Sequence, residues 1–263
     1  MTELREPYRL LAYNSARQSE NKMHDDTVAR QFGFAGGLVP GVDVYAYMTH
    51  PAVARWRRAF LERGSLDVRF QKPVYDGELT TVTAREANGG LDIEVRSREQ
   101  LCATGHAALS AVTAPPIEAF ATVAAVDQRP PASPETLAPD RWLGIRPLAV
   151  TAQFAEQYFA DVRETDPIYA SERLCHPGLL PRLFNWALVH NVVLGPWIHV
   201  ASKVEHFAAV GIGDELSVRA KIVANYERKG HRFVELDGLI LAHGQKPIAR
   251  VVHTAIWQPR ASG

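Results

Sequence analysis

The sequence predicts an α+β fold made of two related halves, in each of which an antiparallel sheet curls around one apolar helix. Three observations lead to this prediction. The motif LVPGV at 38–42 returns as CHPGL at 175–179, and VRFQKPVYDGELTTV at 68–82 returns as VEHFAAVGIGDELSV at 204–218. The separation between the two motifs is nearly the same in both halves, which indicates a duplication. Each half also continues from its first motif into an apolar helix and then into a series of strand patterns.

A change in composition marks the boundary between the halves. Residues 114–145 are rich in Pro and Ala and show neither the helical nor the strand period, which is typical of a connecting segment. We therefore expect an N-terminal repeat at 1–113, a linker at 114–145 and a C-terminal repeat at 146–263. Placed side by side, two such halves form one continuous sheet with two helices against it.

The first half begins with an expected strand over 8–13. A short helix then starts after Asp25 or Asp26, either of which suits an N-cap, and ends at Gly33. An apolar helix is expected over 42–47, directly after the first repeated motif.

Thr49, His50 and Pro51 are expected to end this apolar helix, since Pro is favoured in the first turn of a new helix. The second helix then ends at Gly64. Strands follow it at 66–71, 78–86, 91–96 and 101–112, where apolar and polar residues alternate.

The second half repeats this order. A long apolar helix is expected from Gly178 to about Val193. Strands are expected after it at 198–208, 214–226, 231–242 and 246–257. A sheet curled around each central helix would bury that helix on nearly all sides, which explains why both are so apolar.

Composition narrows the classes of function. Lys plus Arg and Asp plus Glu both total 29, so no net charge attracts nucleic acid or an anionic membrane. The two cysteines, Cys102 and Cys175, provide no disulfide framework, which favours the cytoplasm. The N-terminus MTELREPYRL carries charges where an export signal needs an apolar core, and the apolar stretch at 186–201 is too short to span a bilayer. We expect a cytoplasmic protein without nucleic-acid or membrane partners.

The run NKMHDDTVARQFGFAGGLVPG at 21–41 resembles the hydratase motif of MaoC-like proteins, the (R)-specific enoyl-CoA hydratases and 3-hydroxyacyl-thioester dehydratases. That motif has Asn-Pro-Ile-His, an acidic residue, an Ala, a Gly-Phe pair, and His-Gly where the central helix starts. The spacing from Asn21 to Gly41 fits it, and VRFQKPVYDGEL resembles the strand–turn–strand that follows. The resemblance implies a double hotdog fold and an acyl-thioester hydratase or dehydratase.

Three positions depart from the family motif. The catalytic Asp five residues before the His is Ser19 here, the Pro after the Asn is Lys22, and the His before the helix-starting Gly is Pro40. In the second half, residues 164–169 resemble a degraded copy with Glu for Asp and Tyr for His. The resemblance thus places the surviving site in the first half. The candidates for the missing carboxylate are Glu20, Asp25 and Glu164.

Loss of water from a 3-hydroxyacyl thioester needs a base for the C2 proton, an acid for the leaving hydroxyl and a donor to the enolate oxygen. His24 is the expected base and acid, because imidazole moves protons in both directions near neutral pH. Asn21 is expected to orient the imidazole or to bind water, although a turn-capping role fits it equally. The Gly41 backbone N–H at the helix start is the expected oxyanion donor.

The acyl chain is expected to run along the central helices, beside Val44, Tyr45 and Tyr47. Arg57, in the basic cluster 55–58, either lies on a solvated helix face or contacts a phosphate of coenzyme A or of an acyl carrier protein's pantetheine arm. Coenzyme A or phosphopantetheine would enter as part of the substrate. No metal or redox cofactor is expected, because metal-ligand spacings and phosphate-binding glycine motifs are missing from the sequence.

Two other functions remain open. A hotdog thioesterase would use Asp43, in the first turn of the central helix beside the substrate, to direct water, although a carboxylate there also favours the helix dipole. A non-catalytic acyl-thioester binder would explain Ser19 as a lost carboxylate. Arg182 and Asn185, three residues apart on the second central helix, either face the cleft or pair within the fold. A fused pair of repeats permits a monomer, while exposed sheet edges permit a homodimer.

Overall fold

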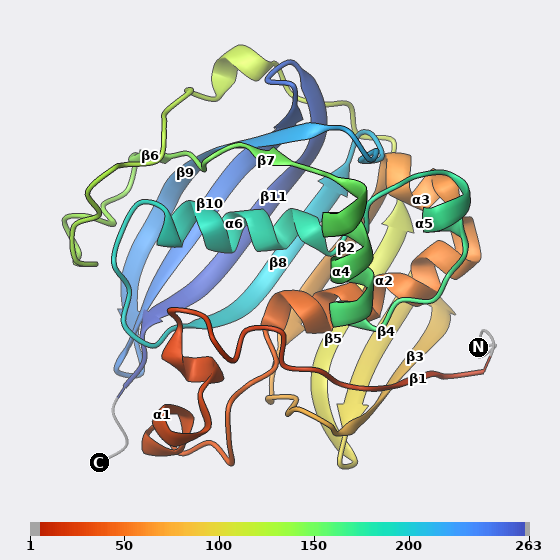
Figure 1. Cartoon of the computed structure of the whole chain (residues 1–263), viewed down its shortest axis with the longest axis horizontal. Coiled ribbons are helices and arrows are strands. Elements are labelled where there is room, and N and C mark those ends of the chain that lie inside the picture. Colours follow the sequence, from red (N-terminus) through yellow and green to blue (C-terminus); the bar gives the residue numbers. More distant parts are fainter. Residues whose placement is uncertain (1–5, 261–263) are drawn as a thin grey trace.

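The computed structural model describes residues 6–260 of the chain, so half of the N-terminal segment MTELREPYRL, residues 1–5, lies outside it. One antiparallel sheet runs through both halves, in the order β1-β3-β4-β5-β2-β8-β11-β10-β9-β6, with β7 also paired to β9. The central helices α2 (Gly41–Trp56) and α6 (Leu179–Val189) lie on one face of this curved sheet (Figure 1). The α+β prediction is therefore confirmed.

The strands follow the predicted order. In the first half they are β1 (Tyr8–Leu11), β2 (Gly64–Phe70), β3 (Leu79–Ala87), β4 (Gly90–Ser97) and β5 (Gln100–Leu109). In the second half they are β6 (Trp142–Leu143), β7 (Leu148–Ala149), β8 (Ile198–His206), β9 (Glu215–Arg228), β10 (His231–Ala242) and β11 (Lys246–Gln258). Most bounds differ from the predicted ones by one to three residues, because turn residues end each alternating pattern.

The two halves join where β2 pairs with β8. In this register Asp67 lies opposite Lys203. The sequence repeat aligns Val68 with Val204 and therefore Asp67 with Lys203. Asp67 thus faces its own counterpart in the other half. A pseudo-twofold axis therefore passes through the centre of the sheet. As a result, the start of each central helix lies close to the other half.

The first central helix is longer than expected. α2 continues through Thr49 and Pro51 to Trp56, although Pro removes a hydrogen bond from the helix interior. Burial outweighs this loss, because Ala52 and Val53 are fully buried beyond the Pro. The break comes instead at Arg57, whose φ is 52°, before α3 (Arg58–Arg63). The predicted stop at residues 49–51 was wrong, while the predicted end at Gly64 is confirmed.

Short helices flank the central ones. In the first half, η1 (Lys22–His24) leads into α1 (Asp26–Gln31), which Asp25 caps as expected. The second half has α4 (Ala152–Val162) and α5 (Ile168–Ser171), neither of which was predicted. Thr151 caps α4 by accepting a hydrogen bond from the Phe154 N–H, and α4 lies against α2 (Figure 1).

The segment expected as a linker at 114–145 contains a short helix, η2 (Ile117–Ala119), and ends in the sheet. Its Trp142 and Leu143 form β6 and pair with β9. The last residues of the segment thus extend the sheet edge of the second half. Among the helices of residues 6–260, none has the length and apolar character that crossing a bilayer requires.

Candidate active site

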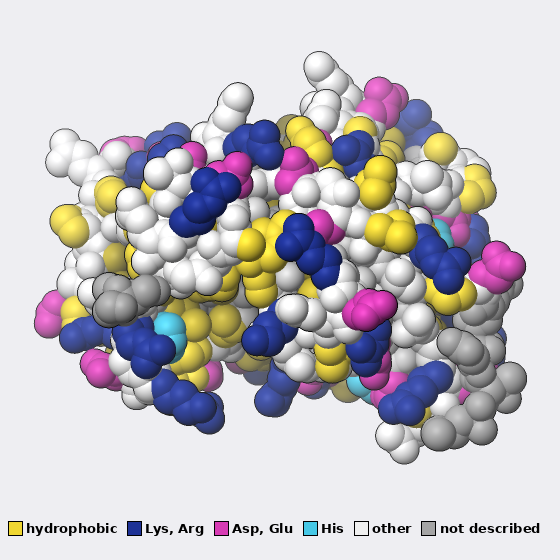
Figure 2. All heavy atoms as spheres, turned by 90° about the horizontal axis from the view of Figure 1, so that it is seen from below, with side chains coloured by type: hydrophobic (Ala, Val, Ile, Leu, Met, Phe, Trp, Pro, Cys, Tyr) yellow, Lys and Arg dark blue, Asp and Glu magenta, His cyan; other side chains and the backbone are white. Residues whose placement is uncertain are grey.

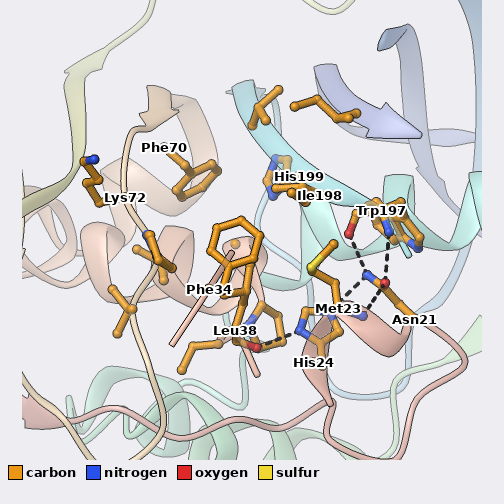
Figure 3. Close-up of a pocket in the computed structure, with 18 of the residues that line it drawn as sticks. Asn21, Met23, His24, Phe34, Leu38, Phe70, Lys72, Trp197, Ile198 and His199 are labelled. Carbon is orange, nitrogen blue, oxygen red and sulfur yellow. Dashed lines mark hydrogen bonds between the residues drawn. The ribbon is translucent and has the colours of Figure 1, made fainter. Parts of the chain in front are cut away.

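His24 lies at the end of η1, where two hydrogen bonds fix its imidazole ring. Its Nδ1 is 2.7 Å from the Leu38 carbonyl oxygen (Figure 3). Because a carbonyl only accepts, Nδ1 carries the proton, and Nε2 carries the lone pair of the ring. That Nε2 atom lies 3.2 Å from the Asn21 side-chain nitrogen. The ring is thus held in the tautomer that can accept a proton at Nε2.

The Asn21 carboxamide makes four hydrogen bonds. Its Oδ1 accepts from the Met23 N–H and the Trp197 N–H, each at 3.1 Å. Its Nδ2 donates to the Trp197 carbonyl at 3.0 Å and to His24 Nε2. These bonds use every strong donor and acceptor position of the amide, so the geometry fits an orienting and capping residue better than a water ligand.

The protonation state of His24 follows from its surroundings. Burial lowers the pKa of its imidazole below the usual value, and this outweighs the Leu38 hydrogen bond and the Asp43 charge, which raise it. At neutral pH the ring is therefore uncharged and basic at Nε2.

The start of α2 offers backbone donors close to this histidine. Pro40 precedes the helix, and within residues 6–260 no group accepts a hydrogen bond from the N–H of Gly41 or Val42. Glycine is required here, because a Cβ on Gly41 would lie 2.9 Å from His199 Nδ1. Free N–H groups at a helix start attract negative charge, so this position suits a developing oxyanion.

Two cavities meet at His24. The first, which we call the apolar cavity, has a volume of about 270 Å³. Its walls include Met23, Phe34, Leu38, Val44, Phe70, Lys72 and Val74 from the first half and Asn185, Trp197, Ile198 and His199 from the second. Residues of the two halves face each other across it (Figure 3).

The second, which we call the polar cavity, has a volume of about 360 Å³. Its polar lining includes Ser15, Ser19, Glu20, Arg129, Arg182 and His190. Both cavities share a wall made of Asn21, His24, Pro40, Asn185 and Trp197. Lys and Arg side chains surround a recess on the lower face of the molecule, where hydrophobic side chains are visible (Figure 2).

Asp43 is fully buried and does not line either cavity. Its carboxylate forms an ion pair with Arg182 and accepts a hydrogen bond from the Ser15 hydroxyl at 2.5 Å. The expected position of Asp43 beside the substrate is thus not found, because Arg182 of the second half covers it. Burial alone would lower the pKa of Arg182, but the charge of Asp43 raises it above the ordinary value.

The expected substrate-contact residues are dispersed. Val44 lines the apolar cavity, whereas Tyr45 and Tyr47 are buried in the core and line neither cavity. The helical period turns these two side chains away from the cavity that Val44 faces. Arg57 is also remote from it, because its guanidinium donates to both Asp166 oxygens, at 2.7 and 3.0 Å.

The three candidates for the missing carboxylate also have other partners. Glu20 lines the polar cavity and accepts from Arg129 at 2.9 and 3.1 Å. Asp25 caps α1 through the Thr27 and Val28 N–H groups. Glu164 lies in the second half, bonded to His50 and His176. Of the three, Glu20 shares a cavity with His24.

Sequence reasoning missed two of the residues that the second half contributes to this site. Asn185 was considered, but Trp197 and His199 follow the central helix without any motif that marks them. They reach the site through the β2–β8 pairing, which brings the start of β8 close to the start of α2. Only a placement of the two repeats in space could have identified them.

No protein-family model and no curated protein matches the chain. Solved structures share its fold at low sequence identity. Rv0216 of Mycobacterium tuberculosis, described as having a double hotdog fold, is 13% identical, with 96% of each chain covered and a TM-score of 0.63. A protein of Chloroflexus aurantiacus described as a MaoC domain dehydratase is 10% identical, with 99% of this chain and 95% of that chain covered and a TM-score of 0.64.

A further structure, described as a MaoC-like dehydratase, is 15% identical, with 99% and 97% coverage and a TM-score of 0.59. Near-complete coverage of both chains means that the similarity spans both repeats. The chain therefore has the double hotdog fold.

Proposed function

We propose that this protein is an acyl-thioester hydratase or dehydratase, which interconverts 3-hydroxyacyl and 2-enoyl thioesters of coenzyme A or an acyl carrier protein. One observation carries the proposal: the His24 Nε2 lone pair is held at the wall between two cavities, near the free N–H groups of Gly41 and Val42. The motif at 21–41 and the MaoC-like dehydratases among the structures of similar fold support it.

In the dehydration direction, His24 Nε2 exchanges its hydrogen bond from Asn21 for the C2 proton of the 3-hydroxyacyl chain. The electrons of the C2–H bond pass to the thioester carbonyl as an enolate, and they then form the C2–C3 double bond as the C3–O bond breaks. The protonated imidazole then donates its proton to the leaving hydroxyl, which departs as water. Asn21 keeps the ring in place, and the N–H groups of Gly41 and Val42 stabilise the enolate oxygen.

The cavities suggest how the substrate lies. The apolar cavity suits the acyl chain, because its walls are formed mainly by hydrophobic side chains. The polar cavity, with Arg129 and Arg182 in its lining, suits the pantetheine arm. Cationic side chains around the recess of Figure 2 suit the phosphates of the carrier.

A thioesterase centred on Asp43 has less support, because that carboxylate is buried against Arg182 and does not reach either cavity. A non-catalytic binder would need the same cavities and is separated from the enzyme by the test below.

The test is product analysis by mass spectrometry. Wild type and His24→Ala are incubated with a short and a medium 2-enoyl-coenzyme A. We expect the intact thioester to gain the mass of one water with the wild type and not with the variant. Release of free acid and thiol would instead indicate a thioesterase. Binding without turnover would indicate the non-catalytic binder.

A further inference from the structure

The second half presents unpaired polar atoms to the apolar cavity. Asn185, Trp197 and His199 line this cavity, and Asn185 Oδ1, Trp197 Nε1 and His199 Nδ1 are buried without a hydrogen-bond partner within residues 6–260. Most buried polar side-chain atoms are paired, so an unpaired group needs an explanation. Three such atoms around one cavity point to a ligand that pairs with them.

Asn185 is the clearest of the three. Its carboxamide makes no hydrogen bond with any described residue, whereas Arg182, one turn earlier on α6, is paired with Asp43. Asn185 lines both cavities and therefore belongs to the wall that contains His24. A carboxamide in this position supplies an acceptor and a donor next to the proposed base.

Trp197 is fixed relative to His24. Its backbone N–H and carbonyl both bond to the Asn21 side chain, and the same side chain donates to His24 Nε2. The indole is 5% exposed and lines both cavities. Its Nε1–H group can only donate, so it requires an acceptor from the ligand.

His199 has a different position. Its Nε2–H donates to the Ala201 carbonyl at 3.1 Å, which leaves Nδ1 as an acceptor beside Gly41. This residue lines the apolar cavity but does not line the polar one, so it is outside the wall that Asn185 and Trp197 share with His24.

We propose that Asn185 and Trp197 bind the C3 hydroxyl group of the substrate. The hydroxyl oxygen accepts from Trp197 Nε1–H, and the hydroxyl hydrogen is donated to Asn185 Oδ1. This inference rests on the proposed function. It assigns a specificity role to the second half, which does not contain His24. An acyl chain without a hydroxyl group at C3 would leave both groups unpaired, so the site selects 3-hydroxyacyl ligands.

The test compares the binding of two ligands of equal chain length, 3-hydroxybutyryl-coenzyme A and butyryl-coenzyme A, by calorimetry. The measurements use the His24→Ala chain, so that bound ligand is not converted. We expect the hydroxylated ligand to bind at least about 10-fold more tightly. Adding Asn185→Leu or Trp197→Phe reduces this ratio to about threefold or less, while the affinity for butyryl-coenzyme A stays the same. Trp142→Phe, on the distant strand β6, is the matched control and leaves the ratio unchanged.

Equal affinity of the His24→Ala chain for both ligands, or no binding of either, would overturn the inference. An equal loss of affinity for both ligands in the Asn185 and Trp197 variants would also overturn the inference, since it indicates a structural role. Mass spectrometry of the wild type separates the two proposals. Hydration without discrimination overturns the hydroxyl site alone, and discrimination without hydration overturns the proposed reaction alone.

Discussion

The two central helices start in the same way but in different surroundings. Gly41 and Gly178 both follow a proline at a helix start. The first glycine lines an open cavity. The second is closely packed, since a Cβ there would lie 2.5 Å from the Ala46 Cβ and 2.8 Å from the Tyr158 hydroxyl. The same local motif thus gives a site in one half and a packed contact in the other.

The residues before each helix show the same contrast. Asn21 accepts from the N–H two residues later, and Asp166 does likewise with Ile168. Three residues after them stand His24, at the cavity wall, and Tyr169, which is buried with its hydroxyl unpaired. The local turn is thus present in both halves, while the residue that follows it lines a cavity in the first half and is buried in the second.

The difference comes from α4. This helix precedes the second site and has no counterpart among the helices described in the first half. Its Tyr158 fills the space beside Gly178. A duplicated site can therefore be closed by adding one helix, without changing the backbone of the motif itself.

The largest expected effect is on catalysis by the first half. We expect His24→Ala to lower kcat/KM by about 10²–10⁴-fold, because it removes the proton-transferring group. The equivalent change in the second half, Tyr169→Phe, should leave kcat/KM within about twofold, since the hydroxyl has no hydrogen-bond partner among residues 6–260. Steady-state hydration kinetics would check both. Similar losses in the two variants would contradict the asymmetry.

The next effect concerns stability. Burial alone would raise the pKa of Glu164, but hydrogen bonds from His176 and His50 lower it well below the usual range. We expect Glu164→Ala to destabilise the protein by about 3 kcal/mol, because a buried polar network loses its centre. Ser19→Ala, at the corresponding position of the first half, should cost about 0.5 kcal/mol or less, since the hydrogen bond that its hydroxyl makes within residues 6–260 is 3.4 Å long. Urea denaturation measures both, and equal values would argue against the contrast.

The two glycines should respond in opposite ways. Gly178→Ala is expected to destabilise the chain by about 1–3 kcal/mol, because its Cβ would meet the Ala46 backbone at 3.0 Å. Gly41→Ala is expected to lower kcat/KM by about 10-fold, because the His199 ring must move at the oxyanion position. Thermal unfolding and kinetics on the same preparations would distinguish them. A loss of activity in Gly178→Ala at full folding would refute the assignment.

The last expected effect is on the pH dependence of stability. Burial lowers the pKa of His199 to about 3 and that of His206 to about 4, and it also lowers the pKa of His253. All three belong to second-half strands. Above pH 6.5 the three imidazoles are neutral in both the folded and the unfolded chain, so they do not lower the free energy of unfolding. As pH falls below 6.5, the unfolded chain binds protons that the folded chain cannot, and stability falls by about 1.4 kcal/mol per pH unit for each histidine.

Denaturation curves at pH 8, 7, 6 and 5 would measure this slope. His253→Leu should make this slope shallower, because it removes one buried imidazole. A flat profile between pH 7 and 5 would contradict the neutral state of the buried rings.

Most of the fold could be predicted from the sequence, because the repeat and the strand periods are local patterns. The continuation of α2 through Pro51 could not be predicted, because the burial of Ala52 and Val53 that outweighs the proline depends on tertiary packing. The same holds for Arg57, which was expected on a solvated helix face or at a phosphate but pairs with Asp166, more than a hundred positions away.

The site divides in the same way. Asn21, His24 and Gly41 belong to one motif of about twenty residues, so the sequence alone could bring them together. Asn185 and Trp197 reach the same wall only through the pairing of β2 with β8. Patterns within a repeat indicate the base, whereas contacts between repeats determine what lies opposite it.

The pairing of β2 with β8 has a consequence for how the gene can change. Because each wall of the cavity is encoded in a different repeat, a deletion of either copy removes part of the pocket, even though one copy alone holds the histidine. The two copies are thus free to diverge in chemistry but must remain on one polypeptide or reassociate as fragments. The connecting segment then acts as a tether that raises the local concentration of one half around the other.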